Sequence, residues 1–361
     1  MARRVLHLTG SPTSPFWADL SRLYASDCLA VTRDLPGIET TIAWVSPDGS
    51  WRFPADLDPA TIEAAPAMTL AGAVARIAAE RIDVMVPQLF CRAGMTAYRA
   101  LFDVLTIPYV GNTAEAMAIG ADKALARAIV AAAGVRVPDG EVVEADGRPT
   151  MAPPVVVKPV DADNSTGVSL VSHAAELPRA IDEARRHGPR VLVERFVPLG
   201  REVRCGVLDL GDGPVALPIE EYRLDPRAGI RTFADKISEV EPGALRLQAK
   251  GEEHAWIVPT SDPAVEAVQT TALRCHRALG CRDYGLFDFR IDPDGQPWFI
   301  EAGLYCSFAE QSVVSTMARA AGWTTADLFR ACVETAAGRA GAAPAARDAA
   351  HPPRDGIEST T

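Results

Sequence analysis

Two acidic residues in the last third of the chain lie on opposite sides of a predicted β-hairpin. Asp288 stands in the mainly apolar run 287–291 and Glu301 ends the run 297–301, with the turn sequence Asp-Pro-Asp-Gly at 292–295 between them. A carboxylate inside a strand is costly unless a cation pairs with it. Two carboxylates on adjacent strands suit Mg²⁺, which prefers hard oxygen ligands and shares them with substrate phosphates. The pattern therefore favours a metal site at these two residues over a purely structural pair.

Two lysines are placed to bind a polyphosphate. Lys158 ends the β-run 155–158, and the small-residue loop that follows, with Ser165 in it, offers backbone N–H groups beside the ammonium. Lys123 opens the helix predicted over 122–133, where the helix dipole opposes a cation unless an anion binds there. An edge-strand lysine and a solvated surface lysine are the alternatives. Taken singly, each lysine fits its alternative better, so the two must be considered with the rest of the chain.

A third segment has the composition of an adenosine-binding clamp. The apolar strand 191–194 leaves into the linker 194–197, whose backbone is able to pair with a flat base. Glu202 follows shortly afterwards and is able to accept hydrogen bonds from ribose hydroxyls. The alternative for Glu202 is a solvated strand residue.

The elements that position these residues differ along the chain. Strands at 5–8, 41–45 and 83–87 alternate with helical patterns at 20–28, 69–80 and 97–104, which predicts an open parallel sheet. Ligands of such sheets lie beyond the carboxyl ends of the strands, so the loop 10–15 with Ser11 and the loop 88–94 with Gln88 are candidate substrate contacts. Ordinary connections are an equally good interpretation of both loops.

From 113 onward the pattern changes to a smaller α+β lobe, with strands at 155–158 and 168–171 and a helix at 174–187. A strand-rich region restarts at 191 and includes a helix over 263–279 and a helix pair over 310–337. We predict an α/β protein with an N-terminal domain (1–112), a central lobe (113–188) and a C-terminal lobe with the metal site (189–338). The Ala-, Gly- and Pro-rich residues 339–361 are predicted to be a disordered tail.

Composition limits the classes of partner. The 361 residues are 48% hydrophobic and 23% charged, which is ordinary for a globular protein of more than one domain. The net charge of -11 argues against nucleic acid as a partner, and no apolar run reaches the length of a membrane span. Seven cysteines without a C-x-x-C pair indicate neither disulfides nor zinc, so we expect a reducing cytoplasm. The sequence leaves open whether the chain is a monomer or a homodimer.

In their order along the chain, these features resemble the ATP-grasp superfamily, and within it the D-alanine–D-alanine ligase branch. The resemblance covers roughly 113–325 and includes the segment 312–322 as a closing helix. It implies ATP and one or two Mg²⁺ ions as cofactors, with Asp288 and Glu301 as the metal ligands. It assigns the remaining contacts as follows: the phosphates to Lys123, Lys158 and Ser165, the adenine to Glu194, Arg195, Phe196 and Val197, the ribose to Glu202, and the γ-phosphate to Lys236. Lys158 and Lys236 would be the catalytic cations.

Three departures from that branch concern the reaction itself. Gly303 stands where the branch has an asparagine that binds the second metal ion, and Leu286 stands where it has an arginine that holds the oxyanion of the reacting carboxylate. The loop 10–15 also lacks the Gly-Gly-x-Ser pattern that recognises the first D-alanine. Carboxylate activation is therefore in doubt.

The stretches 10–24, 83–91, 200–206 and 301–308 resemble more closely the mycosporine-like amino acid ligases. The resemblance implies an ADP-forming ligase that joins a small amino acid (serine, threonine or glycine) to mycosporine-glycine through a phosphorylated enaminone oxygen. The residues expected to contact these substrates are Ser11, Gln88, Tyr305, Ser307 and Ser312. The alternatives are a D-alanine–D-alanine or other dipeptide ligase and a non-catalytic ATP-binding protein of the same fold.

Overall fold

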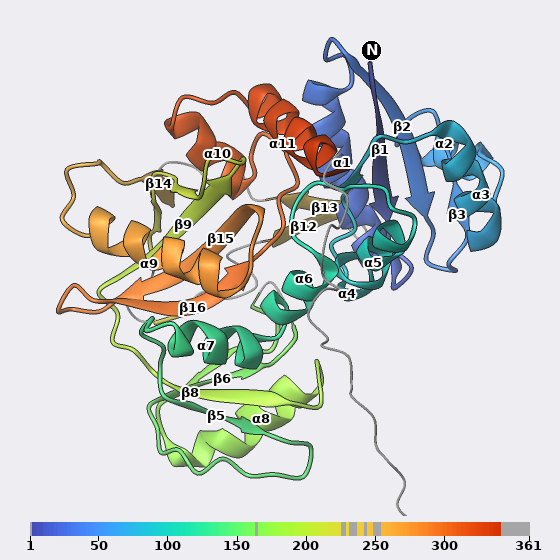
Figure 1. Ribbon diagram of the computed structural model, residues 1–361. Helices are drawn as coiled ribbons and strands as arrows, with labels where there is room; N and C mark the ends of the chain where they lie inside the picture. Colours follow the sequence, from blue (N-terminus) through green and yellow to red (C-terminus); the bar gives the residue numbers. More distant parts are fainter. Residues whose placement is uncertain are drawn as a thin grey trace, which may run out of the picture.

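The computed structural model describes residues 2–162, 165–224, 229–230, 237–241, 244–247 and 254–340. The predictions for Lys236 and for the tail beyond residue 340 lie outside these described residues. Figure 1 shows three sheet-based parts, with the N-terminal sheet at the upper right, the second sheet at the bottom and the third sheet in the middle. Within the described ranges, none of the helices is both long and apolar enough for a membrane span.

The first sheet has the strand order β3-β2-β1-β4. β1 (Arg3–Gly10) runs parallel to β2 (Ile38–Val45) and β4 (Val84–Pro87), and only the short β3 (Trp51–Arg52) is antiparallel. The helices between and after these strands are α1 (Pro15–Thr32), α2 (Pro59–Ala64), α3 (Leu70–Glu80), α4 (Arg92–Met95) and α5 (Ala97–Val104). β1 is buried from Val5 onward, as expected for a parallel strand covered on both faces. The predicted open parallel sheet is confirmed.

The second sheet is antiparallel, with the order β5-β8-β6-β7. Its strands are β5 (Gly140–Val143), β6 (Val155–Pro159), β7 (Ser169–Val171) and β8 (Val191–Arg195). After the 3₁₀ turn Ala174–Glu176, helix α8 (Leu177–Arg185) packs on the sheet through a cluster formed mainly by valines of the strands and by Ala180, Ile181 and Ala184 of the helix. The helix predicted over 174–187 is thus a short 3₁₀ turn followed by an α-helix, because Pro178 sits near the start of α8, where a missing N–H costs nothing.

The third sheet carries the predicted metal ligands. It has the order β14-β11-β9-β15-β16, formed by β9 (Arg201–Asp209), β11 (Glu220–Tyr222), β14 (Ala255–Ile257), β15 (Asp283–Ile291) and β16 (Pro297–Gly303), and β10 (Val215–Ala216) pairs with β9. Val203, Cys205, Phe287 and Phe289 pack in one core with buried residues of α9 (Val265–Ala278). Since side chains alternate along a strand, Glu202, Arg204 and Asp288 point to the opposite face.

The remaining helices connect or cover the sheets. α6 (Ala114–Gly120) and α7 (Lys123–Ala132) lead into the second sheet, and a separate strand pair is formed by β12 (Ile237–Glu241) and β13 (Ala244–Leu247). The predicted final helix pair consists of α10 (Val313–Ala320) and α11 (Thr325–Ala340). Ser312 caps the first of these and Gly322, with a φ of +91°, follows its end. The division into lobes at 112 and 188 stays a prediction.

Asn112 connects the N-terminal sheet to the strands that carry the predicted metal ligands. Its fully buried side chain donates to the carbonyls of Tyr284 and Leu304 at 2.8 Å each and accepts from the N–H of Arg282 at 2.8 Å. The neighbouring Gly111 N–H donates to Asp283 at 2.6 Å. These bonds fix the position of the first part of the chain relative to β15 and β16.

We predict that Gly111→Ala destabilises the protein by about 1–3 kcal/mol more than Gly134→Ala does. Both glycines have a positive φ, so both variants carry the backbone strain of an L-residue there. At Gly111 the new Cβ would also lie 2.3 Å from the buried Tyr284 hydroxyl, whereas at Gly134 no atom of the described residues lies within 4 Å. Chemical denaturation of both variants measures the difference. Equal loss of stability would contradict the close packing at this joint.

Candidate active site

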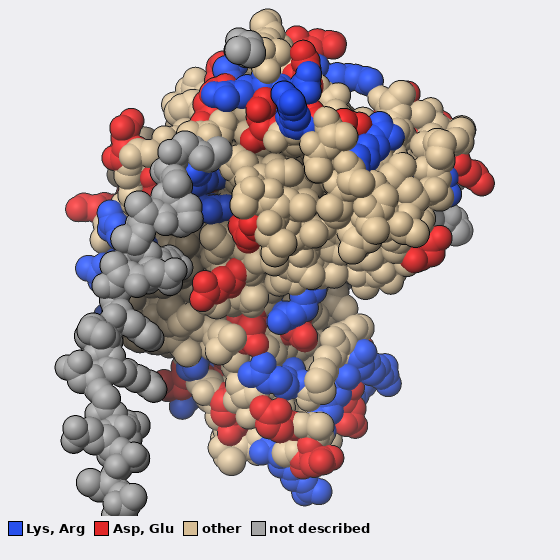
Figure 2. Space-filling view, turned by 45° about the vertical axis from the view of Figure 1, so that its right-hand side comes forward, with Lys and Arg blue, Asp and Glu red and all other residues tan. Residues whose placement is uncertain are grey.

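A pocket lies between the second and third sheets. Its walls come from β6 and β8 on one side, from β9, β15 and β16 on the other, and from the start of α7 and the loop after β6. Figure 2 shows charged side chains of both signs at the waist between the smaller lower part of the molecule and the rest. The pocket brings together most of the predicted nucleotide and metal residues: Lys123, Lys158, Ser165, Glu194, Arg195, Val197, Glu202, Asp288 and Glu301.

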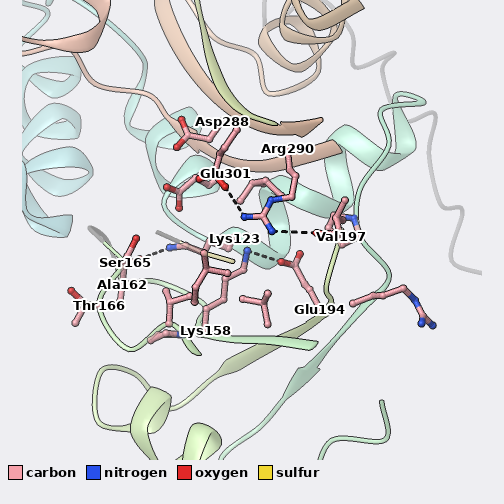
Figure 3. A pocket seen from close by; sticks show the side chains of 18 residues that line it. Lys123, Lys158, Ala162, Ser165, Thr166, Glu194, Val197, Asp288, Arg290 and Glu301 are labelled. Atoms are coloured by element: carbon pink, nitrogen blue, oxygen red, sulfur yellow. Dashed lines mark hydrogen bonds and ion pairs between the residues drawn. The ribbon is translucent and has the colours of Figure 1, made fainter. Parts of the chain in front are cut away.

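Asp288 and Glu301 are direct cross-strand partners on β15 and β16. The register shifts immediately after this pair, so that Ile300 is an extra residue in β16, and both Ile300 and Glu301 line the pocket. The bulge therefore aims the carboxylate of Glu301 to the same side as that of Asp288 (Figure 3). Two oxygen donors side by side at the end of a lysine-lined pocket fit Mg²⁺ held between protein and phosphates.

Arg204, which pairs with the lining residue Asp288, is a contact that the sequence prediction missed. Its Nε lies 2.8 Å from Asp288 Oδ1, and its guanidinium stacks 4.9 Å from the ring centroid of Tyr222. Burial opposes the charge of this arginine, but Asp288, Tyr222, Glu220 and Glu301 outweigh it and raise the pKa of Arg204 well above its ordinary value. The alternation of Glu202 and Arg204 with apolar residues in β9 was the available signal.

Lys158 and Glu194 form a buried ion pair in the opposite wall. Lys158 Nζ lies 2.6 Å from Glu194 Oε2, both side chains are 5% exposed, and Arg127 Nε approaches Glu194 Oε1 at 3.3 Å. Figure 3 shows the lysine directed from below toward Glu194. The carboxylate expected at the adenine thus holds the ammonium of Lys158 in place.

Lys123 lies at the first position of α7, after the N-cap residue Asp122. Its ammonium donates a hydrogen bond to the carbonyl of Ala162, in the loop that leads to Ser165 (Figure 3). Lys123, whose charge is opposed by the dipole of its own helix, therefore contacts the loop that is expected to bind the phosphates. This places both predicted lysines on one pocket.

Arg290 is a second residue that the prediction missed, and it contacts the residues expected to bind the nucleoside. It pairs with Glu202 at 2.6 Å and donates to the carbonyl of Val197 at 3.2 Å, while its guanidinium lies 5.3 Å from the ring centroid of Phe196. Among the described residues Phe196 is not part of the pocket lining, because its ring packs against Arg290. Arg195 lines the pocket, but its exposed guanidinium pairs with Asp139 at 3.3 Å.

The five residues expected to contact the substrates are not among the described residues that line this pocket. Ser11 and Gln88 are fully buried, and Gln88 donates to the carbonyl of Ser307 at 3.1 Å. The Ser312 hydroxyl caps α10, and the Tyr305 ring lies 5.5 Å from that of Phe90. The contact between Gln88 and Ser307 joins the end of β4 to the segment after β16. The substrate roles of all five residues stay predictions.

Comparison with known proteins agrees with this geometry. Residues 141–334 match the family model "D-ala D-ala ligase C-terminus", and the chain is 34% identical to a D-alanine–D-alanine ligase of Mycobacterium sp. (strain KMS) over 267 residues, 72% of this chain and 70% of the relative. The chain belongs to the D-alanine–D-alanine ligase family. It is also 33% identical over 263 residues to the vancomycin B-type resistance protein VanB of Enterococcus faecalis, covering 71% of this chain and 73% of that protein.

Solved structures agree in fold. The D-alanine–D-alanine ligase of Bacillus anthracis complexed with ATP superposes with a TM-score of 0.70 at 20% identity, covering 94% of this chain and 99% of that one. The VanG D-Ala:D-Ser ligase of Enterococcus faecalis gives a TM-score of 0.74 at 19% identity, with 93% and 99% coverage. The predictions of an ATP-grasp fold, of an ADP-forming ligase and of ATP with Mg²⁺ as cofactors are confirmed for this family member.

We predict that Asp288→Asn or Glu301→Gln lowers kcat by roughly 100-fold or more while the protein still folds, although Asp288→Asn also lowers the unfolding temperature because Arg204 loses its charged partner. Each variant keeps the shape and removes one ligand charge, and a metal ion at a phosphoryl oxygen contributes several kcal/mol to the transition state. Initial rates of ADP release at saturating Mg²⁺ and ATP measure the loss. Near-normal rates in either variant would show that its carboxylate is not a metal ligand.

Proposed function

We propose that this ligase phosphorylates an oxygen of an acceptor molecule with ATP and joins a small amino acid there through a new C–N bond. Lys158 and Lys123 bind the phosphates, and Asp288 and Glu301 hold Mg²⁺, which neutralises charge as the phosphoryl group moves. The protein has little covalent chemistry to do in such a reaction. Its residues bind and orient the reactants and neutralise the charge of the phosphates. The proposal also includes the contact of Lys236 with the γ-phosphate and the other nucleotide and substrate contacts predicted from the sequence. It includes a cytoplasmic location and the division of the chain into lobes at 112 and 188 as well.

The acceptor that we propose is the enaminone of mycosporine-glycine. Leu286 and Gly303 are cross-strand partners two residues along their strands from Asp288 and Glu301, so the two pairs lie on the same face of the sheet. This position offers an apolar side chain and a glycine, where activation of a carboxylate needs a cation. That single observation carries the choice of acceptor, since an enaminone oxygen develops no carboxylate oxyanion.

The chemistry of an enaminone explains how ATP would drive the step. Nitrogen donation makes the ring ketone a poor electrophile and puts electron density on its oxygen, so that this oxygen attacks the γ-phosphorus of ATP and ADP leaves. The amino acid nitrogen then adds to the ring carbon and phosphate leaves from it. The product is an imine conjugated with the original nitrogen.

A dipeptide ligase is the second candidate, and similarity favours it. The relatives at 33–34% identity are a D-alanine–D-alanine ligase and VanB. A non-catalytic ATP-binding protein is a third candidate, against which stand the two carboxylates and two lysines of the pocket. The three candidates differ in which acceptor stimulates ADP release.

We predict that mycosporine-glycine with serine, threonine or glycine stimulates ADP release and gives a product with longer-wavelength near-ultraviolet absorption. Replacement of the ketone oxygen by nitrogen shares the positive charge almost symmetrically across the conjugated system and narrows its excitation gap. Coupled ADP release and absorption spectra measure both effects. Stimulation by D-alanine alone would identify a dipeptide ligase, and stimulation by neither would favour the non-catalytic candidate.

We predict that Gly303→Asn folds normally and does not gain D-alanyl-D-alanine synthesis. Among the described residues, a Cβ at this position would contact only Leu286, at 3.9 Å or more, so the added Cβ causes no clash with them. The variant adds an oxygen ligand but leaves Leu286 without a cation for a carboxylate. Mass spectrometry of reactions with D-alanine tests this. Dipeptide formed by this single variant and not by the wild type would show that Leu286 is no barrier.

A further inference from the structure

Arg290 places a positive charge in the part of the pocket where the nucleoside is expected. It lines the pocket together with Glu202 and Val197, and its side chain is 6% exposed. Figure 3 shows Arg290 beside Val197, on the side of the pocket away from Ser165, where the phosphates are expected. Adenosine is uncharged, so a buried guanidinium at this end needs its counter-charge from the protein.

The contacts of Arg290 fix its guanidinium in one orientation. Glu202 on β9 is the cross-strand partner of Arg290 on β15, and Arg290 Nη2 lies 2.6 Å from Glu202 Oε2. Arg290 Nη1 donates to the carbonyl of Val197 at 3.2 Å, and the ring centroid of Phe196 lies 5.3 Å from the guanidinium carbon. Because the guanidinium is planar and rigid, bonds at two of its nitrogens also fix the direction in which it holds the carboxylate.

The pairing leaves Glu202 able to bind a ligand. Its side chain is 14% exposed, it lines the pocket, and the bond to Arg290 uses Oε2. A carboxylate has two acceptor oxygens, so Oε1 keeps its capacity to accept hydrogen bonds from hydroxyl groups. The ion pair therefore provides a charged acceptor whose position is set before the nucleotide binds.

We propose that Arg290 is a positioning residue that holds Glu202 toward the ribose and thereby makes the pocket selective for nucleotides with both ribose hydroxyls. Without Arg290, the poorly solvated carboxylate would lose its counter-charge and either turn toward water or take up a proton. Its hydrogen bonds to the ribose would weaken in both cases. The proposal rests on the ribose contact of Glu202 in the proposed function and not on the choice of acceptor.

The test measures the Kd of ADP, 2′-deoxyADP and 3′-deoxyADP for the full chain by isothermal titration calorimetry, with Mg²⁺ and without acceptor. ADP allows no turnover, so the result does not depend on the acceptor. For the wild type we expect at least one deoxynucleotide to bind roughly 10- to 100-fold more weakly than ADP, because a hydrogen bond from a hydroxyl to a charged acceptor is lost.

Arg290→Met keeps most of the length of the side chain and removes its charge. We expect the ratio of deoxynucleotide Kd to ADP Kd to fall to about threefold or less, mainly because ADP itself binds more weakly. Arg290→Lys keeps a cation beside Glu202, and we expect it to retain a clearly larger ratio than Arg290→Met. A merely structural role of Arg290 would not change this ratio.

Arg201→Met is the matched control. Arg201 precedes Glu202 on β9 and forms ion pairs with Glu221 at 2.5 Å and Asp262 at 2.9 Å. It points to the other side of the sheet and is not among the described residues that line the pocket. This variant also removes an arginine from a pair of acids, and we expect its Kd ratio to equal that of the wild type.

Equal Kd values for the three nucleotides in the wild type would overturn the proposal, even if Arg290→Met did not fold. An Arg290→Met protein that binds all three nucleotides more weakly by one common factor would overturn it as well, and would leave Arg290 as a structural partner of Glu202. The ATP-dependent ligation and the choice of acceptor would stand in both cases. No ADP binding by the wild type would instead count against the nucleotide pocket as a whole, and so against this proposal with it.

Discussion

The antiparallel pairing of β15 with β9 and β16 is the constraint on which the site depends. Arg204, Asp288 and Glu301 become neighbours only because the three strands pair in this register, and a shift by one residue would turn each side chain into the core. The opposite face explains why the register is fixed: Val203, Cys205, Phe287 and Phe289 are fully buried there. The same strands thus provide the core and the reactive face.

Charge neutralisation is the second requirement, since the pocket collects acidic and basic groups in a poorly solvated place. Lys158 with Glu194, Arg290 with Glu202 and Arg204 with Asp288 pair at 2.6–2.8 Å. Removing one partner of a buried pair costs about 3–5 kcal/mol because the other charge remains. The pairs therefore hold the side chains in fixed positions before ATP binds, which reduces the ordering needed for phosphoryl transfer.

The N-terminal sheet is attached to this arrangement through buried amides. Asn112 binds backbone groups at the start of β15 and after the end of β16, and Gln88 binds the carbonyl of Ser307. Side chains expected to contact substrate thus include some that hold the parts of the molecule together. A buried polar group whose hydrogen bonds are satisfied within the protein fixes geometry, and its loss leaves partners unsatisfied.

The sequence by itself determined what local patterns encode: the open parallel sheet, most helices and strands, the hairpin at 292–295 and the acids on its two strands. Strand periodicity and turn chemistry act over a few residues, so they are readable in one chain. Only the tertiary structure decided which groups meet. Arg204 and Arg290 were missed, and so was the pairing of Glu194 with Lys158, because partners in a sheet lie far apart in the sequence and cross-strand contact follows register, which no local pattern specifies.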